Sequence, residues 1–162
     1  MDYLLVGKFI NTHGIKGEIR LISNFERKDL VFKKGIKVYI NNKEFTINSY
    51  RLHKNFDMLT FQEINDINDI LIYKGSNVFV KRDSIPSNIN LKSDLINYEI
   101  VYNNKIIGKL CDFFNNSKYD LMVIKNDKKE YLVPYLDNFI EKIDKNLKQI
   151  FIINMEGLID EN

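Results

Sequence analysis

Cysteine, alanine and long apolar runs are scarce or absent in this chain of 162 residues. The single cysteine, Cys111, has no partner for a disulfide within the chain, and we expect it to lie in a strand as a small apolar residue. No apolar run approaches the ~18 residues that span a bilayer. The first residues also lack the basic leader and apolar block of a secretory signal. These absences predict a cytoplasmic protein with no membrane partner.

The lack of alanine removes the residue with the highest helix propensity. β-branched and aromatic residues dominate the apolar set instead, and these residue types favour strands. Hydrophobic residues make up 44% of the chain and charged residues 28%, which is typical of a folded globular protein. The composition therefore favours an all-β fold, although an AT-rich genome would produce the same bias.

The net charge is only +2, but it is unevenly distributed along the chain. Residues 1–83 contain 14 Lys and Arg against 10 Asp and Glu, a net charge of +4, whereas residues 84–162 contain 10 against 12, a net charge of −2. Between Lys8 and Lys54 there are 11 basic and 4 acidic residues, a net charge of +7. This asymmetry indicates a surface that faces phosphate on one half of the chain only. The alternative is an ordinary solvated face.

The first half of the sequence has the pattern of short strands separated by turns. An Asn-rich turn at residues 41–43 predicts a hairpin, because Asn tolerates the left-handed conformation. Residues 64–74 predict one short helix, capped by Asn65 or Asp66 and followed by Gly75. This pattern predicts a small barrel. The predicted strands lie at residues 16–22, 36–40, 44–47, 49–53, 58–61 and 77–81.

A linker is predicted at residues 84–90, where Pro, Ser and Asn interrupt the strand pattern and the charge changes sign. We therefore expect two domains, residues 1–84 and residues 91–162. The turn spacing of the second half is typical of a small sandwich or barrel. Its predicted strands lie at residues 97–102, 105–114, 121–125, 130–133, 139–143 and 150–153.

A glycine-rich corner near the N-terminus supplies the first candidate binding residues. Gly14 and Gly17 lie between two expected strands, where the backbone needs a positive φ or a close approach to a partner. His13 and Lys16 lie on this corner and Arg20 follows it, and such basic groups contact phosphate without reading bases. His13 either contacts RNA, by stacking on a base or donating to phosphate, or hydrogen-bonds within the turn.

A second basic and aromatic cluster is predicted at Arg51, His53 and Lys54, beside Phe56. Phe56 is more typical of a core residue. Arg51 and Lys54 are therefore the further candidates for contact with RNA phosphates.

The sequence contains few residues of the types that carry out catalysis. Neither His13, His53 nor Cys111 has the local context of a Cys/His or Ser/His/Asp arrangement. No Cys/His cluster has the spacing of metal ligands, and the glycine-rich corner lacks the strand-to-helix context of a phosphate-binding loop. We therefore expect no enzyme, no metal and no cofactor. A small enzyme built around His13 and Lys16 is the alternative.

The opening at residues 6–20 resembles that of the RimM family of ribosome maturation factors. Further similarity follows in the family's order and spacing along nearly the whole chain. Each segment is common by itself, but their order and spacing together are specific. The similar segments are residues 59–64, 66–75, 78–82 with Pro86, 94–96, 107–110, 120–124, 132–135 and 156–158.

The resemblance implies two small β-barrels joined by a short linker. The first is similar to domain two of translation factors, and the second is of the PRC-barrel type. The resemblance also implies a non-enzymatic factor, which we expect to be monomeric. This factor would bind ribosomal protein S nineteen and the precursor rRNA near the head of the immature small subunit and assist 16S rRNA processing. A PRC-barrel adaptor without an RNA role is the remaining alternative.

The implied protein-binding surface contains Asn90, Leu91, Asp94 and Leu95. Family members usually have adjacent tyrosines four and three positions before the Asp-Leu pair, and Asn90 and Leu91 occupy those positions here. We expect Leu91 to offer an apolar anchor, whereas Asp94 and Leu95 are more typical of packing than of contact. Asn97 stands where the family commonly has glycine.

Overall fold

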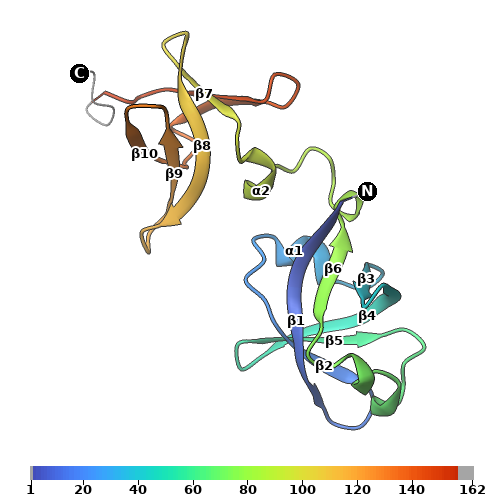
Figure 1. The fold of residues 1–162 in the computed structure, drawn as a ribbon. Helices are drawn as coiled ribbons and strands as arrows, with labels where there is room; N and C mark the ends of the chain where they lie inside the picture. The colour runs from blue at the N-terminus through green and yellow to red at the C-terminus, as the bar shows by residue number, and fades with distance from the viewer. Residues whose placement is uncertain (1, 157–162) are drawn as a thin grey trace. The chain divides into compact units, whose positions relative to one another are not determined.

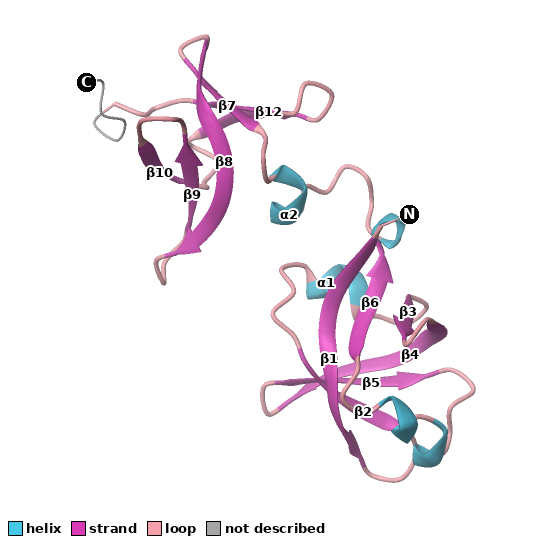
Figure 2. Ribbon diagram, in the orientation of Figure 1, coloured by secondary structure: helices cyan, strands magenta, loops and turns pink. Residues whose placement is uncertain are grey.

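The computed structural model describes residues 2–156, and the chain divides into two compact units between Ile89 and Asn90. Both units consist mainly of strands (Figures 1 and 2). The all-β fold with two units predicted from the sequence is therefore confirmed. Part of the family-like segment at residues 156–158 lies outside the described residues. Within the described part of the chain, no helix is long and apolar enough to cross a membrane.

The first unit is a closed six-stranded barrel with the strand order β1-β2-β5-β4-β3-β6. Its core contains fully buried apolar side chains such as Phe9, Ile19 and Leu59. The strands predicted at residues 44–47 and 49–53 form one strand, β4, with an irregularity between Ile47 and Ser49. The elements are β1 (Tyr3–His13), β2 (Glu18–Ile22), α1 (Lys28–Val31), β3 (Lys37–Ile40), β4 (Lys43–His53), β5 (Phe56–Phe61), η1 (Ile67–Asp69), η2 (Leu71–Tyr73), β6 (Asn77–Lys81) and η3 (Arg82–Ser84).

Three hairpins turn through two residues that both have positive φ angles. Positive φ at both positions defines a type I′ turn, whose twist matches that of the flanking strands and which accepts Asn. The Asn-rich turn predicted at residues 41–43 is therefore confirmed. The turn residues are Asn41 and Asn42 (50° and 66°), Lys54 and Asn55 (49° and 68°), and Asn103 and Asn104 (49° and 63°).

The helix predicted at residues 64–74 is wrong, because this segment forms the two short 3-10 turns η1 and η2. The predicted ends are right: the Asp66 side chain accepts a hydrogen bond from the Asn68 amide at 2.8 Å, and Gly75 has a φ of 89°. Only Ile70 is buried in the interior of the segment. One inward apolar side chain anchors a tight turn, whereas a helix needs a continuous apolar face.

The second unit is a six-stranded sheet with the order β10-β9-β8-β7-β12-β11. Its strands pair antiparallel except for β12 and β7, which are parallel. Unlike the first unit, this sheet has two edge strands, β10 and β11, so the predicted barrel is not a closed ring of strands in the described residues. The elements are α2 (Lys92–Leu95), β7 (Glu99–Tyr102), β8 (Lys105–Asn115), β9 (Asp120–Lys125), β10 (Glu130–Pro134), β11 (Ile140–Asp144) and β12 (Gln149–Ile152).

Two details of the second unit bear on the sequence predictions. Cys111 lies in β8 as predicted, but its side chain is exposed and not packed in the core. Asn97 has a φ of 75°, a conformation that glycine adopts freely and Asn tolerates. The structure therefore gives a physical reason for Asn where the family commonly has glycine.

The Arg82 side chain holds the linker at two points. The Arg82 guanidinium donates to the carbonyl oxygens of Ile85 and Ile89, at 3.2 and 2.9 Å. Between these two acceptors, residues 86–88 are exposed. The linker therefore contains a short accessible stretch whose two ends are fixed to Arg82.

We expect a protease of broad specificity to cut the full chain within residues 86–88 and leave two folded fragments. Arg82→Ala should speed this cleavage several-fold, because it removes the donor for both linker carbonyls. A time course followed by mass spectrometry measures both effects, with Lys74→Ala at an exposed position as the control. Cleavage elsewhere, or equal rates for the two variants, would refute this account of the linker.

Candidate nucleic-acid interface

The register of four neighbouring strands brings basic and aromatic side chains to one face of the first unit. Arg20 on β2 pairs with Met58 on β5, and Met58 pairs with Arg51 on β4. Cross-strand partners lie on the same face of a sheet, so Arg20 and Arg51 share one face. Two further cross-strand pairs lie on this face, His13 with Glu18 and His53 with Phe56. We call His13, Glu18, Arg20, Arg51, His53 and Phe56 the Arg20 cluster.

Arg20 is held from two sides. Its Nη2 lies 3.1 Å from Nδ1 of His13, and its Cζ lies 5.0 Å from the centre of the Phe56 ring. Because guanidinium nitrogens only donate, Nδ1 of His13 must accept this hydrogen bond. The Arg20 Nε is buried without a partner among the described residues. The guanidinium plane is thus fixed on the aromatic ring, and one of its N–H groups stays unsatisfied.

The two histidines of the chain lie together in this cluster. The ring centres of His13 and His53 are 5.5 Å apart, with an angle of 54° between the rings. Partial burial lowers the pKa of His53 below its usual value, and the positive charges of Arg51 and Lys54 lower it further. His53 is therefore mainly neutral at pH 7, and an anion placed at the cluster would favour its protonation.

Arg51 forms an ion pair with Glu18. Its Nε and Nη2 donate to the two carboxylate oxygens at 2.9 and 2.7 Å. These hydrogen bonds hold the pKa of Glu18 below its usual value. The charge of Arg51 is thus balanced within the protein, so among the predicted RNA contacts Arg51 has the weakest electrostatic basis.

Lys16 and Lys54 lie outside the cluster, on two exposed turns. The Lys16 turn needs its glycines, because Gly17 has a φ of 98° and a Cβ there would lie 2.9 Å from Cγ2 of Ile64. The amide of Ile67 donates to the carbonyl of Ile15 at 3.1 Å and fixes the turn to the following segment. The glycines thus hold a rigid corner that presents Lys16 to solvent.

A buried charge that the sequence analysis missed lies beside the cluster. The Asp57 side chain is only 1% exposed and accepts hydrogen bonds from Lys28 Nζ at 2.9 Å and from the Tyr50 hydroxyl at 2.6 Å. Burial and this hydrogen bond to Asp57 raise the pKa of Tyr50 to about 12. Tyr50 also stacks on Phe32, with ring centres 5.7 Å apart. The network fixes helix α1 and the following residue to strands β4 and β5.

The predicted protein-binding residues of the second unit have a different environment. Leu91 and Leu95 have no exposed surface, which agrees with the packing role expected of Leu95 and leaves Leu91 without the accessible apolar surface expected of an anchor. Asp94 accepts a hydrogen bond from the Leu91 amide at 3.0 Å and caps α2. Asn90 is half-buried. Contact of a partner protein with Asn90 or Asp94 stays a prediction.

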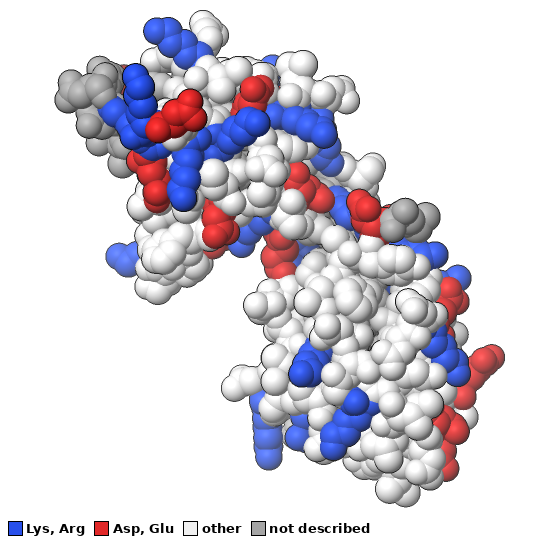
Figure 3. Space-filling view, in the orientation of Figure 1, with Lys and Arg blue, Asp and Glu red and all other residues white. Residues whose placement is uncertain are grey.

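The visible surface of the first unit has an uneven charge distribution. Figure 3 shows several basic side chains with no acidic one among them at the lower left of this unit, whereas acidic and basic side chains alternate along the opposite edge. Within residues 2–156, no group of three or more His, Cys, Asp or Glu side chains is placed to hold a metal ion. The chemistry offered by the Arg20 cluster is therefore cation, hydrogen-bond donor and aromatic ring, a combination that suits single-stranded RNA.

Fold and site together define a class: a two-unit β protein with a basic, aromatic face on its first barrel. Comparison with known proteins makes this class specific. Residues 4–85 match the RimM N-terminal domain family, and residues 92–158 match the RimM PRC barrel domain family. The chain therefore belongs to the RimM family of ribosome maturation factors.

Individual relatives agree with this assignment. The chain is 41% identical to the ribosome maturation factor RimM of Staphylococcus aureus (strain NCTC 8325 / PS 47), over 96% of this chain and 98% of that protein. It is 39% identical to the same factor of Staphylococcus haemolyticus, with the same coverage. A crystal structure of a 16S ribosomal RNA processing protein RimM from Pseudomonas aeruginosa matches with 19% identity and a TM-score of 0.46, covering 93% of this chain and 96% of that one. The family assignment rests on the sequence matches.

Proposed function

We propose that this chain is a non-enzymatic factor that assists assembly of the small ribosomal subunit and 16S rRNA processing in the cytoplasm. The first unit binds precursor rRNA, and the second unit binds ribosomal protein S nineteen. The observation that carries the RNA part is the Arg20 cluster, in which a guanidinium is fixed on an aromatic ring next to two histidines. Family membership makes ribosomal RNA the expected ligand.

Two weak sites on one chain would act together. Once one unit is bound, the linker keeps the other at a high effective concentration near its own target. Such a factor brings RNA and protein together without a chemical step. The net charge of −2 over residues 84–162 suits a basic ribosomal protein, and the net charge of +4 over residues 1–83 suits RNA.

The test is to pull down the tagged full chain from cells and identify what it carries. We expect precursors of 16S rRNA together with ribosomal protein S nineteen. A chain with Lys16→Glu and Lys54→Glu, both at exposed turn positions, should carry less precursor rRNA. Recovery of ribosomal protein without RNA would favour the adaptor alternative, and recovery of neither would refute the proposal.

The affinity for rRNA should rise as the pH falls from 7.5 to 5.5. His53 is mainly neutral in the free protein, because its pKa is lowered there. The negative charge of a bound phosphate raises this pKa, so binding takes up protons. The expected gain is about threefold or more, measured by titration at constant ionic strength. His53→Gln should remove most of this gain. An affinity that is independent of pH in the unchanged chain would contradict a phosphate at the cluster.

A further inference from the structure

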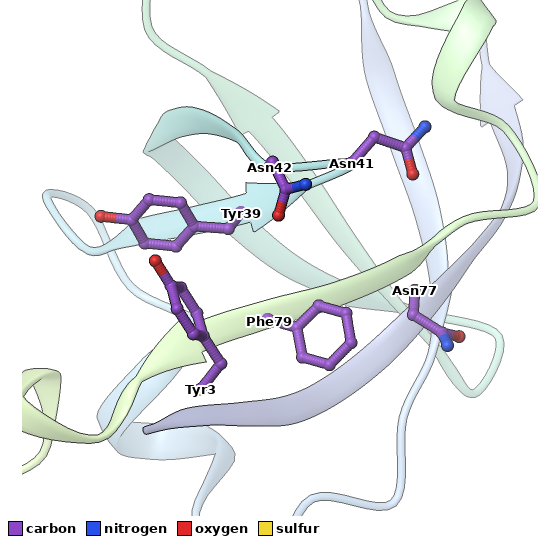
Figure 4. A pocket seen from close by; sticks show the side chains of 6 residues that line it. All are labelled: Tyr3, Tyr39, Asn41, Asn42, Asn77 and Phe79. Carbon is purple, nitrogen blue, oxygen red and sulfur yellow. The ribbon is translucent and has the colours of Figure 1, made fainter. Parts of the chain in front are cut away.

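A pocket of about 380 Å³ opens on the outer face of the first barrel, away from the Arg20 cluster. Strands β3 and β6, which carry three of its six lining residues, lie opposite β2 and β5 in the closed strand order. Its volume lies within the range of about 300–1,000 Å³ that is typical of small-molecule sites. Three aromatic rings and three carboxamides line it (Figure 4), those of Tyr3, Tyr39, Phe79, Asn41, Asn42 and Asn77.

Strand register accounts for the aromatic part of the pocket. Phe79 on β6 pairs with Tyr39 on β3 and with Leu5 on β1. The flanking residues Val78 and Val80 are fully buried, so Phe79 and its partners point outward. An outward row of large rings on a barrel whose core is already filled is an unusual use of aromatic residues.

The rings are arranged around an open space. The ring centres of Tyr3 and Tyr39 are 5.3 Å apart with an edge-to-face angle of 83°, and Tyr3 remains 52% exposed. In Figure 4 the tyrosines lie at one end of the pocket, the amides of Asn41 and Asn77 lie toward the other, and Phe79 lies between. A flat ligand would therefore meet aromatic surface and carboxamides together.

The turn backbone accounts for the position of two of the three carboxamides. Asn41 and Asn42 form the type I′ turn between β3 and β4, which itself accounts for Asn at these two positions. Asn77 has no such reason, since it is an exposed first residue of β6 and Asn is depleted in strands. A carboxamide offers both donors and an acceptor, as the edge of a nucleobase does.

Charge decides which class of partner suits the pocket. The Lys81 Nζ lies 5.1 Å from the centre of the Tyr39 ring, and Lys8 pairs with Asn77 across the strands. Two acids lie nearby. Glu44 accepts a hydrogen bond from the Tyr39 hydroxyl at 3.0 Å and lies 3.8 Å from Lys37, and Asp83 is close enough to Lys81 to interact with its charge. Lys8, Lys37 and Lys81 thus stand against two acids around the rings, a positive balance that favours a polyanion over the basic segment of a ribosomal protein.

We propose that this pocket binds an unpaired RNA base, stacked on the rings of Phe79 and Tyr3 and hydrogen-bonded at its edge by the Asn carboxamides. Lys8 and Lys81 contact the flanking phosphates. Stacking on aromatic rings accepts any base, so the site recognises single-stranded RNA and not a fixed sequence. The inference rests on the proposed function only in taking RNA as the partner, and it places a second RNA contact on another side of the barrel.

The test uses the full chain and two RNA probes, a labelled hexamer of adenylate and a base-free hexamer with the same ribose-phosphate backbone. Phe79→Leu and Tyr3→Leu should each weaken binding of the adenylate hexamer about 5- to 100-fold. The slope of the logarithm of affinity against the logarithm of salt concentration should stay the same, because no phosphate contact is removed. Phe114→Leu, at an exposed aromatic position of β8, is the matched control and should have no effect.

The base-free hexamer separates stacking from charge. The unchanged chain should bind it more weakly than it binds adenylate, and Phe79→Leu should weaken this binding no further. A loss of affinity with a smaller salt slope, equal affinities for Phe79→Leu and Phe114→Leu, or no binding of the adenylate hexamer would each overturn the pocket. None of these outcomes affects recovery of precursor rRNA in the pull-down, so the proposed function is tested separately. Melting temperatures of all variants confirm that they fold.

Discussion

Lys28→Met should lower the free energy of unfolding of the first unit by about 2–4 kcal/mol. The Asp57 carboxylate is only 1% exposed, and without Lys28 it keeps the Tyr50 hydroxyl as the one side-chain donor among the described residues. A buried carboxylate that loses its cation is strongly destabilising. Lys28 is itself 35% exposed, so water replaces part of the lost interaction. Amide hydrogen exchange of the β5 core in the full chain measures the change in the first unit alone.

A neighbouring ion pair provides the control. Arg27 and Asp29 are joined at 2.9 Å, but their side chains are 39% and 62% exposed. Arg27→Met should therefore change stability by less than about 0.5 kcal/mol. Combining Lys28→Met with Asp57→Asn should recover part of the loss, since the unpaired charge is gone. Equal effects of Lys28→Met and Arg27→Met would mean that the buried pair does not hold α1 to the barrel.

Local signals in the sequence were sufficient for most of the fold. Asn at positions 41–42 and 103–104 predicts tight turns because few residues accept two successive positive φ angles, and the structure has turns there. The helix predicted at residues 64–74 was wrong because the sequence does not show which of its apolar side chains pack against the barrel. Ile67 and Leu71 share a helical face with Ile70 in sequence, yet only Ile70 is buried. The capping residues alone cannot distinguish a helix from two 3-10 turns.

The candidate site was harder to predict from the sequence, because its contacts join strands that are far apart along the chain. Arg51 and Glu18 are 33 positions apart, and the sequence does not indicate that they pair. The structure brings His13, Arg20 and Arg51 together, as three of the five predicted RNA-binding residues, but leaves Lys16 and Lys54 on separate turns. Strand alternation offered one unused signal, because Asp57 stands two positions before buried Leu59 and so points inward.

Inward and outward faces of the same strands therefore have different uses. On β5, Asp57 fixes the fold, whereas the adjacent Phe56 supports Arg20 on the opposite face. A charge reversal at Arg20 or Arg51 would disturb these contacts as well as any RNA. Variants that test electrostatics cleanly are those at Lys16 and Lys54, which are exposed.

Affinity of the full chain for a small-subunit rRNA fragment should fall by about 16- to 1,000-fold between 50 and 200 mM monovalent salt. This range corresponds to about three to five neutralised phosphates and a log–log slope of roughly −2 to −5. Lys16→Glu combined with Lys54→Glu should weaken binding and reduce the slope by about one to two, because each lysine accounts for at most one released counterion. Lys105→Glu, an exposed lysine after a type I′ turn of the second unit, provides the same change of charge as a control. If affinity does not depend on salt, or if the control flattens the slope equally, the basic half of the chain is only a solvated surface and RNA binds elsewhere.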